Sequence, residues 1–97
     1  MPTYITLANF TDQGVRNAKD TVKRAEAFKD LAKKHGVTVK DIYWAQGQYD
    51  VVTILEAPDD LAVTSLALSA GALGNIRTQT LRLFSPGDMK AIIDKMA

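Results

Sequence analysis

The sequence contains no cysteine, which excludes disulfide bonds, thiolate metal sites and cysteine nucleophiles. It also lacks an excess of either charge, because 12 Lys and Arg residues oppose 11 Asp and Glu residues and leave a formal net charge of +1. This balance argues against nucleic acid, anionic lipid and polyacidic partners, which a field of one sign would attract. No basic amino-terminal region or apolar run is long enough for a signal peptide or a membrane span. We therefore expect a cytoplasmic protein with no membrane and no nucleic-acid partner.

The composition fits one folded domain. The chain has 97 residues, of which 46% are hydrophobic and 24% charged, so it can bury a core but has no room for a second domain. No repeat, linker or low-complexity segment interrupts it. We expect residues 1–97 to form a single domain.

Residue periodicity divides the chain into strands and helices. Strands are predicted over 3–10, 37–45, 49–55 and 76–84, where apolar residues alternate with polar ones or β-branched and aromatic residues are enriched. Apolar residues at steps of three and four predict a helix from Thr11-Asp12 to Lys34, whose continuity is weakest near Asp20-Thr21. A second helix is predicted from Pro58 to Gly74, and a tail helix over about 86–96.

The order β-α-β-β-α-β with an added helix is typical of an α+β ferredoxin-like plait, in which both main helices cover one face of a four-stranded antiparallel sheet. We expect the helix-facing residues to be Ile5, Leu7, Val52, Ile54, Leu81 and Leu83. The open face is then expected to carry Tyr4, Thr6, Ala8, Tyr49, Val51, Thr53, Leu55, Thr78, Thr80 and Arg82. Because such a mixed face is costly to leave in water, a second subunit or a ligand is expected to cover it.

Three segments of the sequence resemble the GYD domain family, a group of small proteins of unknown biochemical role. The segments are Phe10–Gly14, Gly47-Gln48-Tyr49-Asp50-Val51-Val52 and Gly74–Leu81, and the likeness extends from about Tyr4 to Phe84. The resemblance implies a ferredoxin-like subunit that pairs sheet to sheet into a dimeric α+β barrel, and it brings no established catalytic residues. Many members have a proline in the first helical region, where this chain has Asp20-Thr21-Val22.

The signature turn supplies the first candidate site residues, Tyr49 and Asp50. A phenol and a carboxylate at a tight turn could bind a polar group or relay a proton. The same residues also suit a structural role, because Gly47 can adopt the positive φ of a turn and Asp50 can accept backbone N–H bonds. Both interpretations stay open at this point.

Further candidates lie on the strands. Arg82 could bind a carboxylate ligand or pair with Asp50 or Glu56 across a dimer. Thr6, Thr53 and Thr80 have no adjacent base, so we expect them to supply cavity polarity, or simply to favour the strands, rather than to act as nucleophiles. His35 is the only histidine and lies at a predicted helix end, so we expect it to cap that helix, and we expect neither a metal nor a cofactor.

These features lead to one main function and two alternatives. The main prediction is a homo-oligomer, a dimer or an assembly of dimers, that binds a small, partly apolar molecule in an inter-sheet cavity lined by Tyr49, Thr53, Thr80 and Arg82, with Asp50 at the rim. One alternative is a cofactor-free oxygenase or isomerase of aromatic or polyketide-like compounds, which rests on fold analogy. The other is a structural or regulatory protein-interaction module. No catalytic residue is assigned.

Overall fold

The computed structural model describes residues 1–97 and contains one antiparallel sheet with the strand order β2-β3-β1-β4. The strands are β1 (Thr3–Phe10), β2 (Thr38–Trp44), β3 (Val51–Glu56) and β4 (Ile76–Leu83). β1 is central because it pairs with both β3 and β4, while β2 pairs with β3 alone. Helical regions follow β1 and β3, so the chain has the ferredoxin-like α+β plait that the sequence predicts.

The first helical region is broken where helix propensity is weakest. It consists of α1 (Asp12–Arg16), the 3₁₀ turn η1 (Ala18–Asp20) and α2 (Thr21–Lys34). The hydroxyl of Thr11 caps α1 by accepting a hydrogen bond from a backbone N–H of the first turn. The weak point predicted near Asp20-Thr21 is therefore a real break, although no proline causes it.

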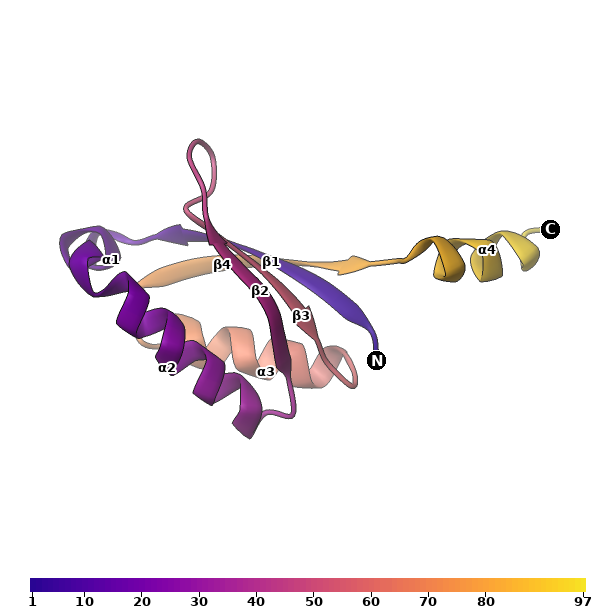
Figure 1. Ribbon diagram of the computed structural model, residues 1–97, viewed down its shortest axis with the longest axis horizontal. Helices are drawn as coiled ribbons and strands as arrows, with labels where there is room; N and C mark the ends of the chain where they lie inside the picture. Colours follow the sequence, from indigo (N-terminus) through magenta and orange to yellow (C-terminus); the bar gives the residue numbers. More distant parts are fainter.

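The two long helices cover one face of the sheet. α3 (Asp60–Gly71) follows β3 and contacts β4, and α2 contacts β2. Figure 1 shows both helices below the sheet, while the opposite face has no helix over it. None of the helices combines the length and the apolar character that crossing a bilayer requires.

The two sheet faces are the reverse of the sequence prediction. Tyr4, Thr6 and Ala8 are 3%, 7% and 4% exposed because they face the helices. The strand register places three β3 residues beside them on this face, namely Leu55, Thr53 and Val51. The face without helices, which we call the open face, carries the residues predicted to be internal: Ile5, Leu7, Val52, Ile54, Leu81 and Leu83.

Local hydropathy could not choose between these faces, because both carry apolar residues. One deciding contact is distant in sequence: the hydroxyl of Tyr4 donates a hydrogen bond of 2.5 Å to Asp60 at the start of α3. A tyrosine can be buried when its hydroxyl has such a partner. The helices also bury small residues such as Ala25 and Ala70. Of the Ile and Leu residues on β1 and β3, only Leu55 faces the helices, while Ile5, Leu7 and Ile54 lie on the open face.

The closed part of the core lies where β1 begins and β3 ends. Its buried members are Tyr4, Ala32, Val37, Leu55, Ala57, Val63 and Leu66. Phe28 and Leu31 of α2 pack against this cluster. Towards the other end of the sheet, the same two layers do not close completely.

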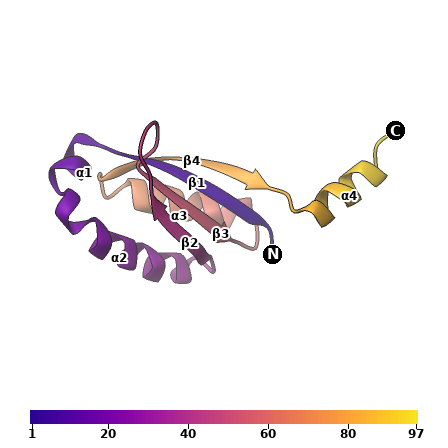
Figure 2. The same cartoon turned by 45° about the horizontal axis from the view of Figure 1, so that its top comes forward.

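α4 (Pro86–Asp94) extends away from the rest of the molecule beyond the end of β4 (Figures 1 and 2). Ser85 and Asp88 form a capping box, in which Asp88 accepts from the Ser85 backbone at 3.1 Å and the Ser85 hydroxyl accepts from the Asp88 backbone at 3.0 Å. The backbone N–H and hydroxyl of Ser85 lower the pKa of the Asp88 carboxyl below its usual value. Every residue of α4 is exposed, including the apolar stripe that Met89, Ile92 and Ile93 form.

Candidate functional site

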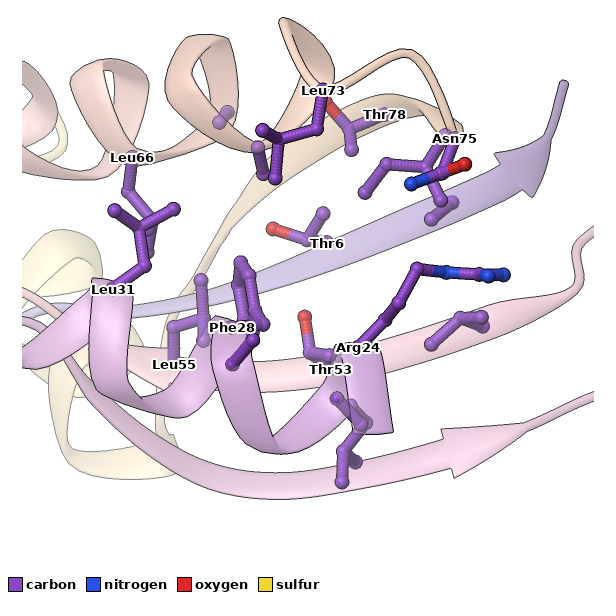
Figure 3. Close-up of a pocket in the computed structure, with 18 of the residues that line it drawn as sticks. Thr6, Arg24, Phe28, Leu31, Thr53, Leu55, Leu66, Leu73, Asn75 and Thr78 are labelled. Carbon is purple, nitrogen blue, oxygen red and sulfur yellow. The ribbon is translucent and has the colours of Figure 1, made fainter. Parts of the chain in front are cut away.

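A cavity of about 570 Å³ lies between the sheet and the helices α2 and α3 (Figure 3). Its volume falls in the range of about 300–1,000 Å³ that is typical of small-molecule sites. Small side chains on all sides explain it: Ala8 on the sheet, Ala25 on α2, and Ala67 and Ala70 on α3. None of these side chains reaches far from its backbone, so the two layers leave space between them. Because 16 of the 24 lining residues are hydrophobic, the cavity suits a largely apolar molecule.

The character of the lining changes along the cavity. Near the closed core it is formed by Phe28, Leu31, Leu55 and Leu66, which we call the apolar end. In Figure 3 the opposite side of the cavity carries Arg24, Asn75 and Thr78, which we call the polar end. A molecule that fills the cavity therefore meets mainly hydrocarbon at one end and polar groups at the other, although the exposed Asp30 and Lys34, which flank Leu31 on α2, also belong to the lining.

Two threonine hydroxyls lie on the sheet side, midway along the cavity. Thr6 and Thr53 are cross-strand neighbours in β1 and β3. The Thr6 hydroxyl is 3.3 Å from that of Thr80, but the buried hydroxyl of Thr53 has no hydrogen-bond partner. Figure 3 shows the Thr53 oxygen directed into the cavity. A buried polar group without a partner costs on the order of 1–3 kcal/mol, which a ligand with a polar atom at this point would recover.

The wall at the polar end is built by two of the segments that resemble the GYD family. The backbone N–H of Thr11 donates to the carbonyl of Asn75 at 3.0 Å, and the Thr11 hydroxyl donates to the carbonyl of Gly74 at 2.5 Å. Gly14 fits against the same backbone, because a Cβ atom there would lie 2.0 Å from the carbonyl oxygen of Asn75. These contacts join the turn after β1 to the turn before β4.

Gln13 orients the side-chain amide of Asn75. The Gln13 Nε2 donates to the carbonyl of Leu73 at 3.1 Å and to Oδ1 of Asn75 at 3.0 Å. Since Nε2 can only donate, Asn75 turns its oxygen towards Gln13 and its Nδ2 the other way. In Figure 3 this nitrogen points into the cavity, where it offers N–H donors.

Arg24 supplies a positive charge at the polar end. Its guanidinium donates to the carbonyls of Asn17 at 2.6 Å and Gly14 at 3.2 Å, and it lies over the Phe10 ring at 5.9 Å from the centroid. These contacts hold the group in place but do not neutralise its charge. Neither of the two ion pairs within the chain includes Arg24.

Asp50 occupies a structural position in the turn before β3. β3 begins at Val51, two residues later than predicted, so Asp50 belongs to the connection over 45–50. Its carboxylate accepts a hydrogen bond of 2.9 Å from the backbone N–H of Phe10, and its own N–H donates to the carbonyl of Ala8 at 2.9 Å. Gly47 has a φ of +97°, as a tight turn requires. The turn role that the sequence allowed is therefore present, and a ligand role for Asp50 stays a prediction.

The other predicted site residues do not meet in one place. Tyr49 donates from its hydroxyl to Gln79 at 3.1 Å, and Gln79 lies opposite Leu7 on the open face. Thr53 lines the cavity and Thr80 is within hydrogen-bond distance of the Thr6 hydroxyl, so both threonines lie on the helix-facing side of the sheet. Within one chain these residues therefore do not meet on one face of the sheet, and a site that they form between two sheets stays a prediction.

Arg82 lies at the end of β4, away from the cavity. Its guanidinium is 4.7 Å from the ring centroid of Phe84 and 5.6 Å from that of Tyr4. It donates to the carbonyl of Thr3 at 3.4 Å and to that of Leu83. Within the chain it forms no ion pair with an acidic side chain, and a pair across a dimer stays a prediction.

The sequence interpretation missed Arg24 and Asn75. Arg24 lies four residues before Phe28, so on a helix both side chains project from the same side, and this spacing was the available signal. Asn75 lies within a family-like segment, but its contact with Gln13 joins residues that are 62 positions apart. Only the folded chain shows that contact.

These features define a class of protein: a small ferredoxin-like α+β subunit with a bare apolar sheet face and a cavity beneath its helices. The family model described as GYD domain matches residues 4–93, and the chain belongs to this family. The resemblance seen in the three sequence segments is thereby confirmed.

Two known proteins from Thermus thermophilus are similar to this chain. One is the glutamine synthetase and cystathionine beta-lyase binding protein, which is 33% identical over 92 residues, with 94% of this chain and 97% of the relative covered. The other is TTHA0845, whose crystal structure has a TM-score of 0.57, covering 88% of this chain and 95% of that chain at 21% identity. At that identity the second likeness establishes the fold alone.

Proposed function

We propose that this protein is a small protein-binding module that acts as a homodimer, in which two copies pair through their open faces. The apolar open face is the observation that supports pairing. Its central row consists of Ile5 of β1 between Ile54 of β3 and Leu81 of β4, and it meets a polar side chain only at Asp41 of the edge strand β2. An apolar surface of this kind, continuous across several strands, is unfavourable in water and typical of an interface.

Pairing of two identical sheets gives a closed, two-fold arrangement. Sheets that pack face to face lie about 10 Å apart, and their side chains interdigitate. The same patch then serves both copies, as two-fold symmetry requires. The helices α2 and α3 remain on the outside of each subunit, so their cavities stay clear of the interface. This is the dimeric α+β barrel that the sequence resemblance implies.

The name of the Thermus relative supports a role in protein binding, since that protein is described as binding glutamine synthetase and cystathionine beta-lyase. In this chain α4 is the segment that we propose contacts a partner protein. It projects from the body and exposes Ile92 and Ile93 by 40% and 55% on one side. An amphipathic helix of this kind can bind in an apolar groove of a partner.

The pairing proposal is tested by substitution on the open face. Ile5→Lys places a charge in the centre of the proposed interface, whereas Val22→Lys places one on α2, where Val22 is already 61% exposed. In sedimentation equilibrium we expect dimers for the unmodified chain and for Val22→Lys, and monomers for Ile5→Lys. A monomeric unmodified chain would overturn the pairing.

The partner proposal needs a separate pair of variants. Ile93→Glu changes the apolar stripe of α4, and Ala91→Glu changes the opposite side of the same helix. Purified glutamine synthetase and cystathionine beta-lyase of the source organism are the partners to mix with each dimer. We expect a complex that survives Ala91→Glu and is lost with Ile93→Glu. Equal binding by both variants would remove α4 from the interface, and binding to neither enzyme would count against these partners.

A second function, binding of a small and partly apolar molecule, is supported by the cavity and by the unpartnered Thr53 hydroxyl. We propose that this site lies between the sheet and the helices α2 and α3, in place of the inter-sheet cavity that the sequence suggested. Native mass spectrometry of gently purified protein tests it, because a retained non-protein mass is read together with the number of subunits. We expect such a mass to disappear in Ala70→Leu, whose larger side chain occupies the cavity.

A further inference from the structure

We infer that the cavity takes an amphiphilic carboxylate, with its apolar body against Phe28 and Leu66 and its carboxylate between Arg24 and Asn75. The inference rests on the small-molecule function proposed above and specifies the chemical class of its ligand. The order of groups along the cavity sets the orientation, since hydrocarbon lines one end and polar groups the other.

At the polar end, the side chains of Arg24 and Asn75 present N–H donors to a ligand and no acceptor. Arg24 is exposed along part of its length, and its guanidinium carries five N–H donors, of which the carbonyls of Asn17 and Gly14 engage one each on two nitrogens. Asn75 directs Nδ2 into the cavity, because its Oδ1 is held by Gln13. An acceptor that carries negative charge satisfies both groups, and a carboxylate does so with short, charge-assisted hydrogen bonds.

The lack of an ion-pair partner for Arg24 favours an anion at the polar end. Arg24 has two carbonyl acceptors and an aromatic face beside it, but no ion-pair partner within the chain. A guanidinium at the edge of an apolar cavity gains most from a counter-ion brought into the same low-dielectric space. A neutral ligand would leave this charge uncompensated.

The apolar end determines the body of the ligand. Its aliphatic and aromatic residues offer no polar atom, and the charged residues beside Leu31, Asp30 and Lys34, are exposed on α2, so a hydrocarbon chain or ring fits there. The hydroxyl of Thr53 lies midway and lacks a partner. A carboxylate that also carries a hydroxyl or keto oxygen along its body would satisfy Thr53, so hydroxy and oxo acids form the best-matched members of the class.

The test compares octanoate with octan-1-ol, which has the same hydrocarbon chain without the charge. Trp44 is the only tryptophan of the chain and lines the cavity, so its fluorescence reports occupancy. We expect octanoate to bind the unmodified protein at least tenfold more tightly than it binds Arg24→Gln. Octan-1-ol should bind both proteins equally. Arg24→Lys keeps the charge and should recover part of the octanoate affinity, and Arg16→Gln, at an exposed position of α1, should change nothing.

Other results separate failure of the ligand class from failure of the small-molecule function. If octanoate and octan-1-ol bind alike, or if Arg24→Gln weakens both equally, the carboxylate assignment is wrong while the cavity remains a site for small molecules. If neither probe binds, or if binding survives both Ala70→Leu and Ala67→Leu, the cavity is not the site and both proposals fall. Circular dichroism of each variant confirms that a loss of binding is not a loss of fold.

Discussion

The carboxylate of Asp50 accepts a hydrogen bond of 2.9 Å from the backbone N–H of Phe10, so the signature turn is tied to the last residue of β1. Phe10 in turn lies under the guanidinium of Arg24 and lines the polar end of the cavity. The Asp50 side chain therefore supports the cavity wall from outside it.

Removing this acceptor should destabilise the protein without removing a ligand contact. We expect Asp50→Ala to lower the free energy of unfolding by about 1.5–3 kcal/mol, the range for hydrogen bonds to a charged group. Asp50→Asn should cost less, because its amide oxygen can still accept from Phe10. Urea unfolding measures both. If Asp50→Ala retained full stability but lost octanoate binding, a direct ligand role for Asp50 would be supported instead.

Gly14 is a position where the backbone leaves no room for a side chain. A Cβ atom would lie 2.0 Å from the carbonyl oxygen of Asn75, and because the obstacle is backbone, no simple rotamer change relieves the overlap. We expect Gly14→Ala to destabilise the chain by at least about 1–3 kcal/mol, as overpacking does. Gly87→Ala is the matched control, because a Cβ there would lie at an ordinary 3.7 Å from the Ser85 hydroxyl. Thermal unfolding of the two variants should differ clearly, and equal melting temperatures would contradict the close contact.

The hydrogen bond between the Tyr4 hydroxyl and the Asp60 carboxylate stabilises the fold and is lost at alkaline pH. The hydrogen bond to Asp60, followed by burial, raises the pKa of Tyr4 above its ordinary value of 10.0. Because the folded-state pKa is the higher one, the stabilisation is complete below pH 10 and is lost as the pH rises through the folded-state pKa. We expect Tyr4→Phe to be less stable than the unmodified chain at neutral pH, with the difference shrinking above pH 10. Guanidinium unfolding over this pH range measures the change, and a constant difference would contradict the assignment.

Much of the fold could be predicted from local patterns. The broken first helical region, the glycine turn at Gly47 and the capping box at Ser85 each depend on neighbouring residues, and each is present. The sheet faces depend instead on contacts such as that between Tyr4 and Asp60, which are 56 positions apart. Hydropathy cannot predict such a contact, because both Ile5 and Tyr4 are residues that can be buried in a protein core.

A register shift in β2 also limits what alternation can predict. The pairing with β3 slips between Val39 and Asp41, so the alternation of sides cannot be followed through the strand from sequence alone. After this point Ile42 and Trp44 fall on the helix-facing side, opposite Thr53 and Val51. Periodicity alone therefore could not predict the cavity that Trp44 lines.

The buried hydroxyl of Thr53, which has no hydrogen-bond partner, is expected to lower the free energy of unfolding of the ligand-free protein. Valine has nearly the shape of threonine, so Thr53→Val removes a buried hydroxyl that has no partner and leaves the packing almost unchanged. We expect the free energy of unfolding of the ligand-free protein to rise by about 1 kcal/mol, because the desolvation cost of that group is no longer incurred. Thr6→Val is the matched control from the neighbouring strand: its hydroxyl has Thr80 as a partner, so its removal should bring no gain.

Octanoate has no oxygen along its chain and should bind Thr53→Val as it binds the unmodified protein, whereas a hydroxy or oxo acid of equal length should bind more weakly. Proteins commonly retain such a cost where a site needs the group for function. A Thr53→Val variant that is no more stable would mean that the hydroxyl is satisfied in solution, and the preference for an oxygen at this point of the ligand would then lose its basis.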